Sequence, residues 1–118
     1  MEYVDGFIIP VPKKKLGEYK KMAKLAAKVW REHGALDYRE CVADDAPFGK
    51  RTSFPRSVKQ KAGETVVFAF ITYKSRKHRD AVNKKAMNDK RFGNMDPKKM
   101  PFDTKRMIWG GFKTIVQA

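Results

Sequence analysis

Asp5 is the strongest candidate for a functional side chain, because it is a charged residue among apolar ones. It lies between Tyr3 and Phe7 on one face of an alternating apolar run. A carboxylate on such a face must find a partner or change its pKa, because burying an unpaired charge is costly. We expect Arg106 to be that partner, since it begins a strand predicted to lie beside the strand of Asp5.

Eight side chains are candidates for the lining of one cavity between a sheet and its helices. The polar members would orient a small organic or anionic ligand, and the aromatic members would supply apolar contact. The candidate ligand-binding residues are Asp5, Trp30, Arg79, Asn83, Phe102, Asp103, Arg106 and Trp109. A structural interpretation competes: an Asp5–Arg106 ion pair would set strand register, Asn83 would cap a backbone group, and both tryptophans would be core.

A second candidate for anion binding is the basic run at residues 76–79, which opens a predicted helix. Free backbone N–H groups at a helix N-terminus attract anions, and Arg79 would add a guanidinium. The alternative is that these side chains extend into water or pair with Asp80. Both interpretations remain open at the level of sequence.

Several other classes of site find no support in the sequence. One Cys and two His argue against a disulfide framework and a structural zinc site. No nucleophile motif, glycine-rich phosphate loop or metal-ligand spacing is present. We therefore expect no metal and no cofactor. The sequence indicates no catalytic residue and leaves open whether the chain is an enzyme.

The net charge of +14 is the most conspicuous feature of the composition. Such a charge attracts polyanions, so non-specific binding of nucleic acid is the alternative function. Against it, the lysines are not interleaved with exposed aromatic residues, and no RNA-binding or helix-turn-helix signature is present. The N-terminus does not resemble a signal peptide, and no apolar run is long enough to cross a membrane. We expect a cytoplasmic protein with no membrane contact.

The elements that must position these residues are organised around a strand at 65–73, which is apolar on both faces. Further strands are predicted at 3–11, 36–43 and 106–116, with helices at 16–33 and from the N-cap Ser75 to about 89. We expect Cys41 to be buried in its strand and residues 58–60 to form a short hairpin with the central strand. Gly110-Gly111 suggests a bulge or a close backbone approach.

This order of elements predicts an α+β fold of the ferredoxin-like βαββαβ type, with residues 1–118 as a single domain. The first and third strands would be central in a four-stranded antiparallel sheet, with both helices on one face. The other face would expose roughly four large apolar side chains of the central strand, each worth about 1.5–3 kcal/mol when buried. We therefore expect a homodimer joined through these faces.

The segment at 91–104 has no periodicity and is predicted to be a long loop. We expect it to fold over the open end between the sheet and the second helix. Phe102 would then plug the cavity, and Asp103 would lie near Arg106 or Arg79.

Five sequence stretches also carry a resemblance that covers nearly the whole chain. They are YVDGF at 3–7, VWREHGAL at 29–36, TSFPRSV at 52–58, HRDAVN at 78–83, and MPFD with KRMIWGGF between 100 and 112. The sequence resembles a small bacterial family of uncharacterised YbaA-like proteins, domain of unknown function 1428. The resemblance implies a dimeric α+β barrel and no particular activity.

Overall fold

The computed structural model describes residues 1–92 and 96–118 and contains one four-stranded antiparallel sheet. The strands are β1 (Tyr3–Pro12), β2 (Asp37–Val42), β3 (Glu64–Tyr73) and β4 (Ile108–Lys113). Their order across the sheet is β2-β3-β1-β4. The predicted ferredoxin-like fold is confirmed, with the first and third strands central.

Two long helices connect these strands, α1 (Leu16–Glu32) and α3 (Arg76–Met87). Ser75 caps α3 as predicted, because its hydroxyl accepts a hydrogen bond from the backbone N–H of His78. Gly34 follows the end of α1 with a positive φ of 118°, a conformation that glycine adopts without steric cost.

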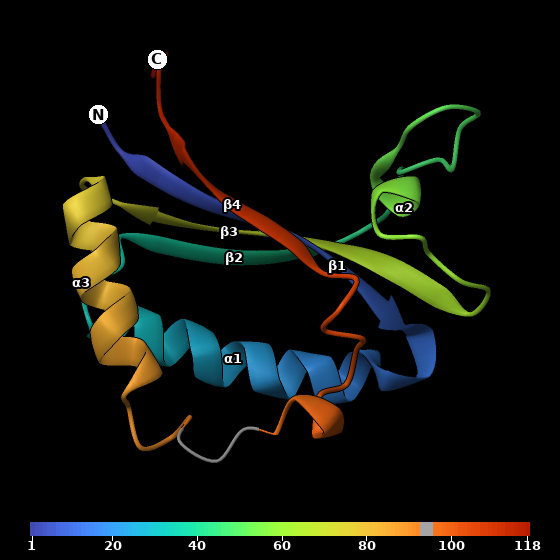
Figure 1. The fold of residues 1–118 in the computed structure, drawn as a ribbon, viewed down its shortest axis with the longest axis horizontal. Helices are drawn as coiled ribbons and strands as arrows, with labels where there is room; N and C mark the ends of the chain where they lie inside the picture. Colours follow the sequence, from blue (N-terminus) through green and yellow to red (C-terminus); the bar gives the residue numbers. More distant parts are fainter. Residues whose placement is uncertain (93–95) are drawn as a thin grey trace.

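Both long helices cover the same face of the sheet (Figure 1). The residues of β1 and β3 that point to this face pack with Tyr19 and Ala23 of α1 and with Val82 of α3. Helical spacing predicts that Arg79, Val82, Asn83 and Ala86 form the inner stripe of α3. Val82 and Ala86 are fully buried and the other two are half-buried, so the stripe is confirmed.

The opposite face is covered at one end only. The short helix α2 (Phe54–Ser57) lies there (Figure 1), and it replaces the hairpin predicted at 58–60. Val58, which follows α2, buries Ile8 of β1 and Val66 of β3. The central strand therefore exposes fewer apolar side chains than the four predicted, because the chain around Val58 folds back over part of this face.

The rest of this face is open to solvent, and we call it the open face. Three large apolar side chains on it are more than two-fifths exposed: Phe68 (42%), Ile108 (44%) and Phe112 (60%). Cys41 lies opposite Phe68 in the register and is exposed too. The expectation of a buried thiol was wrong, because β2 is an edge strand and nothing in the described part of the chain covers this side of it.

Candidate functional site

Four of the eight predicted ligand-binding residues lie together at one end of the helix-covered face. Asp5 of β1 is 2% exposed and points at α3. Its Oδ1 atom is 3.7 Å from Nη1 of Arg79, which is an ion pair but too long for a hydrogen bond. The expected pairing of Asp5 with Arg106 is wrong.

Asn83 joins this cluster to α1 and β3. Its Oδ1 accepts hydrogen bonds from Nε1 of Trp30 at 2.9 Å and from the hydroxyl of Tyr73 at 3.2 Å. With both lone-pair directions of Oδ1 occupied, the amide is held in one orientation. Asn83 thus holds the side chains of Trp30 and Tyr73 in place within the cluster. Trp30 contributes a hydrogen bond as well as apolar surface.

Two buried polar atoms in the cluster make no hydrogen bond among the described residues: Oδ1 of Asp5, and Nε of Arg79, which meets Oδ1 of Asp80 only in an ion pair at 3.2 Å. Burial raises the pKa of the Asp5 carboxyl above its ordinary range, and the positive charge of Arg79 opposes this shift. Unpaired buried polar groups are rare and costly, so each calls for an explanation. We call Asp5, Arg79, Asn83, Tyr73 and Trp30 the Asp5–Arg79 cluster.

Strand β4 lies close against this cluster. Gly111 lies opposite Asp5 in the register, and a Cβ atom there would collide with the hydroxyl of Tyr3 and lie 2.9 Å from Nη2 of Arg79. Gly111 is therefore a site of close approach, as predicted, although the register runs through it without a bulge. Trp109 is on the same side of β4 and is 61% exposed, so it is not a core residue.

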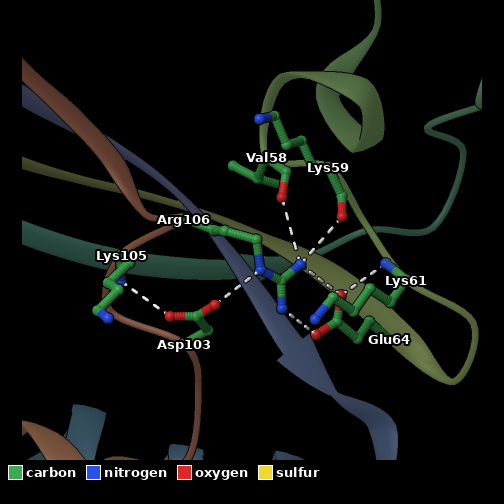
Figure 2. A network of polar contacts seen from close by, with 7 residues as sticks. All are labelled: Val58, Lys59, Lys61, Glu64, Asp103, Lys105 and Arg106. Atoms are coloured by element: carbon green, nitrogen blue, oxygen red, sulfur yellow. Dashed lines mark hydrogen bonds and ion pairs between the residues drawn. The ribbon is translucent and has the colours of Figure 1, made fainter.

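Two of the other predicted residues, Asp103 and Arg106, belong to a second network at the opposite end of β1 (Figure 2). Arg106 donates two hydrogen bonds to Glu64, at 2.9 and 2.6 Å, and one to Asp103 at 2.9 Å. Its Nη1 also reaches the carbonyl oxygens of Val58 and Lys59. The predicted proximity of Asp103 to Arg106 is confirmed, but these residues do not line a cavity with Asp5.

Phe102 packs on α1 and not beneath α3. Its ring makes an edge-to-face contact with Tyr19, with ring centroids 5.7 Å apart, and it joins the core cluster around Ile9 and Val11. The prediction that Phe102 plugs a cavity beside the second helix was therefore wrong. Residues 93–95, in the middle of the predicted loop, lie outside the described residues.

The basic run that opens α3 does not form a cluster of converging cations. Arg76 and Lys77 are exposed, and Nδ1 of His78 accepts a hydrogen bond from the backbone N–H of Lys74. Arg79 turns inward, with its guanidinium over the ring of Tyr3 and beside Asp5. Only Arg79 of this run belongs to the candidate site.

An open groove of about 260 Å³ lies between α1 and β2, and none of the predicted site residues lines it. Its apolar wall comes from Leu16, Ala23 and Ala27 of α1 and from Val42 and Val67 of the sheet. Sequence reasoning missed it because alanines at helical spacing are typical of a core stripe. The one available signal was Glu40, a carboxylate in alternation with Tyr38 and Val42 on an edge strand.

Across residues 1–92 and 96–118, no three His, Cys, Asp or Glu side chains are grouped closely enough to hold a metal ion. No helix within the described part of the chain is long and apolar enough to cross a membrane.

The carboxylates of the Arg106 network predict acid lability. Hydrogen bonds from Arg106 hold the pKa of Glu64 and of Asp103 below their ordinary values of 4.5 and 3.8. A lowered folded-state pKa contributes stability above the ordinary pKa, and this stability is lost as pH falls through the folded-state pKa. We expect the free energy of unfolding to fall as pH drops below about 4.5, with Asp5 acting in the opposite sense because its pKa is raised.

Urea unfolding from pH 7 to pH 3 measures this effect. The Glu64→Gln variant serves as the comparison, because it removes one of the depressed carboxyls, and its stability should depend less steeply on pH below 4.5. A wild-type stability that stays constant down to pH 3 would contradict the assignment.

Comparison with known proteins shows which family this chain resembles. Residues 2–104 match the family model described as "Protein of unknown function (DUF1428)". The chain is 48% identical to the uncharacterized protein YbaA of Escherichia coli K12 and to that of Shigella flexneri. Each match spans 116 residues, 98% of this chain and 98% of each relative.

A solved structure shares the fold at low sequence identity. It is a dimeric ferredoxin-like protein from an uncultured marine organism, with a TM-score of 0.56, 12% identity and coverage of 100% of both chains. Since the family model and the full-length relatives both match most of the chain, it belongs to the DUF1428 family of proteins of unknown function.

Proposed function

We propose that the chain forms a homodimer and binds a small organic molecule at the Asp5–Arg79 cluster. The observation that carries the binding proposal is a pair of buried polar atoms that make no hydrogen bond in the described part of the chain, Oδ1 of Asp5 and Nε of Arg79. A ligand that hydrogen-bonds to both would remove the cost of leaving them unpaired. Trp109 and Phe7, on the same side of neighbouring strands, would contact its apolar body.

The charges of the cluster indicate an uncharged polar group on the ligand. Arg79 is already paired with Asp5 and with the exposed carboxylate of Asp80, so an anionic ligand gains nothing from its charge, and Arg79 would repel a cationic one. The carboxylate oxygen needs a donor and the guanidinium nitrogen needs an acceptor. A primary carboxamide offers both on adjacent atoms, and an aromatic body would stack on the exposed indole of Trp109.

Phenylacetamide is a suitable probe, and the two tryptophans provide the readout. We expect it to shift the indole N–H signals of Trp30 and Trp109 in ¹H–¹⁵N spectra. Phenylacetone, which accepts but does not donate, should bind more weakly. The Asp5→Asn variant should lose roughly tenfold in affinity or more, because a hydrogen bond to a charged group is worth about 1.5–3 kcal/mol.

Asp37→Asn is the matched control, because it makes the same change on β2, two strands from Asp5 and on the opposite face of the sheet. It should bind phenylacetamide as the wild type does. Indole signals that do not move at saturating probe, or equal affinities for the wild type and Asp5→Asn, would refute the site.

The homodimer is supported by the open face. Phe68, Ile108 and Phe112 are apolar and exposed there, and a contiguous patch of this kind marks an interaction surface. A second copy packed sheet to sheet would cover the same patch on both chains. The similar marine protein is described as dimeric, which favours the same assembly for this fold.

Polyanion binding is the second candidate, favoured by the lysines of the α1 region. Seven of them are exposed: Lys13, Lys14, Lys15, Lys20, Lys21, Lys24 and Lys28. Binding of this origin comes from counterion release and carries no sequence information. We expect duplex and single-stranded oligonucleotides of unrelated sequence to bind alike at low salt, and their affinities to fall by orders of magnitude by about 0.2 M salt.

Fluorescence anisotropy over a salt series measures this dependence. Selective binding of one sequence that persists at physiological salt would make nucleic acid the primary ligand.

A further inference from the structure

The groove between α1 and β2 has a polar centre built from three side chains. The hydroxyl of Tyr19 donates to Oε1 of Glu40 at 2.5 Å, and the hydroxyl of Tyr38 donates to Oε2 at 2.7 Å. Burial, reinforced by the charge of Glu40, raises the pKa of both tyrosines, so both remain donors. The carboxylate is therefore held from two sides inside an otherwise apolar groove.

Small side chains create the space around this centre. Ala23 and Ala27 lie one helical turn apart on α1 and line the groove, and Ala69 lies opposite Glu40 in the β2–β3 register. A volume of about 260 Å³ is just below the range of roughly 300–1,000 Å³ that is typical of ligand pockets. The groove thus suits one small molecule.

Two cations stand at the solvent side of the groove. Lys20 and Lys24 line it and are one helical turn apart on α1, and both are exposed. They would complement an anionic group at the rim. Each oxygen of Glu40 accepts one tyrosine hydroxyl and retains a second lone pair, so the centre of the groove can still accept a hydrogen bond.

We infer that this groove binds a small organic acid with an apolar body, whose hydroxyl group donates to Glu40 and whose carboxylate meets Lys20 and Lys24. Each part of this molecule matches a separate feature of the groove: the alanine-lined wall, the acceptor held by Tyr19 and Tyr38, and the two rim lysines. The inference does not depend on the Asp5–Arg79 cluster, because the two sites share no residue.

A series of three probes separates these contributions: 4-hydroxyphenylacetate carries all three groups, phenylacetate lacks the hydroxyl, and 4-hydroxybenzyl alcohol lacks the carboxylate. By calorimetric titration we expect the first to bind most tightly, and loss of either group to cost roughly tenfold in affinity. Glu40→Gln should reduce the advantage of 4-hydroxyphenylacetate over phenylacetate, because the amide offers one acceptor oxygen in place of two.

Charge-matched variants test the rim. Replacing Lys20 and Lys24 together with alanine should weaken binding of both carboxylate probes about tenfold and leave 4-hydroxybenzyl alcohol unaffected. Replacing Lys21 and Lys28 removes the same charge from outside the groove and should change nothing.

Ala27→Leu fills the groove and should abolish binding of all three probes, while Ala81→Leu on the exposed side of α3 should not. Equal affinities across the probe series, or binding that survives Ala27→Leu, would overturn the inference. So would equal losses from the two lysine pairs, which would indicate a general charge effect.

Discussion

Replacing Arg106 with methionine is expected to destabilise the protein by about 3 kcal/mol. Arg106 joins the segment before β4 to Glu64 at the start of β3 and to the carbonyl oxygens of Val58 and Lys59 (Figure 2). Methionine keeps much of the volume but leaves the carboxylate of Glu64, which is 8% exposed, without its cation. Removing one partner of a buried pair costs about 3–5 kcal/mol, and the partial exposure of Arg106 favours the lower end.

Arg91→Met is the matched control for this substitution. Arg91 also bonds two carboxylates, Glu32 and Asp89, but its side chain is 37% exposed against 14% for Arg106. In the Arg91→Met variant, water can replace the hydrogen bonds that Arg91 made. The free energy of unfolding should therefore fall much less than in Arg106→Met. Urea denaturation of both variants gives the comparison. Equal losses of stability in the two variants, or an Arg106→Met variant as stable as the wild type, would contradict the stabilising role of the buried Arg106–Glu64 pair.

Phe112→Asp is expected to dissociate the proposed homodimer while each chain stays folded. Phe112 is 60% exposed on the open face, over Gly6 and Gly110, so its replacement removes little packing within one chain. In a twofold dimer each substitution acts twice. Losing two buried aromatic side chains at about 2 kcal/mol each corresponds to roughly a thousandfold weaker dimer, before the cost of burying two carboxylates is added.

Trp109→Asp provides the control on the same strand. Trp109 is 61% exposed but points to the helix-covered side, so its substitution should leave the dimer intact. Light scattering at micromolar concentration distinguishes the two states. A monomeric wild type, or a Phe112→Asp variant that remains dimeric, would exclude association through the open face.

Periodicity was enough to predict the fold. The alternation in β1 and β3 and the stripe on α1 lie where the sequence indicated, and the strand order follows from the order of elements. The cover of the open face was not predictable in the same way. A helix as short as α2 has no periodic signal, and its effect on Val66 arises only from tertiary contact.

Asp5 was given the wrong partner because the residue pattern of a strand does not show which residue of the neighbouring strand lies opposite it. Gly6 faces Gly110 in the β1–β4 pair, so Arg106 falls near the far end of β1, where Pro12 faces Glu64 of β3. Arg79 is nearest to Asp5 because α3 crosses the other end of the sheet. The clustering of Asp5 with Arg79, Asn83 and Trp30 could be predicted from inward-facing positions, whereas the separation of Asp103 and Arg106 from them could not.

A high-resolution crystal structure of the protein as purified tests the central claim most directly. We propose that Oδ1 of Asp5 and Nε of Arg79 make no hydrogen bond within residues 1–92 and 96–118 because a small organic molecule supplies their partners. We expect electron density for a multi-atom molecule, larger than water, within hydrogen-bond distance of both atoms and against Trp109. A single bridging water, or an Asp5–Arg79 pair closed into direct bidentate hydrogen bonds, would contradict it.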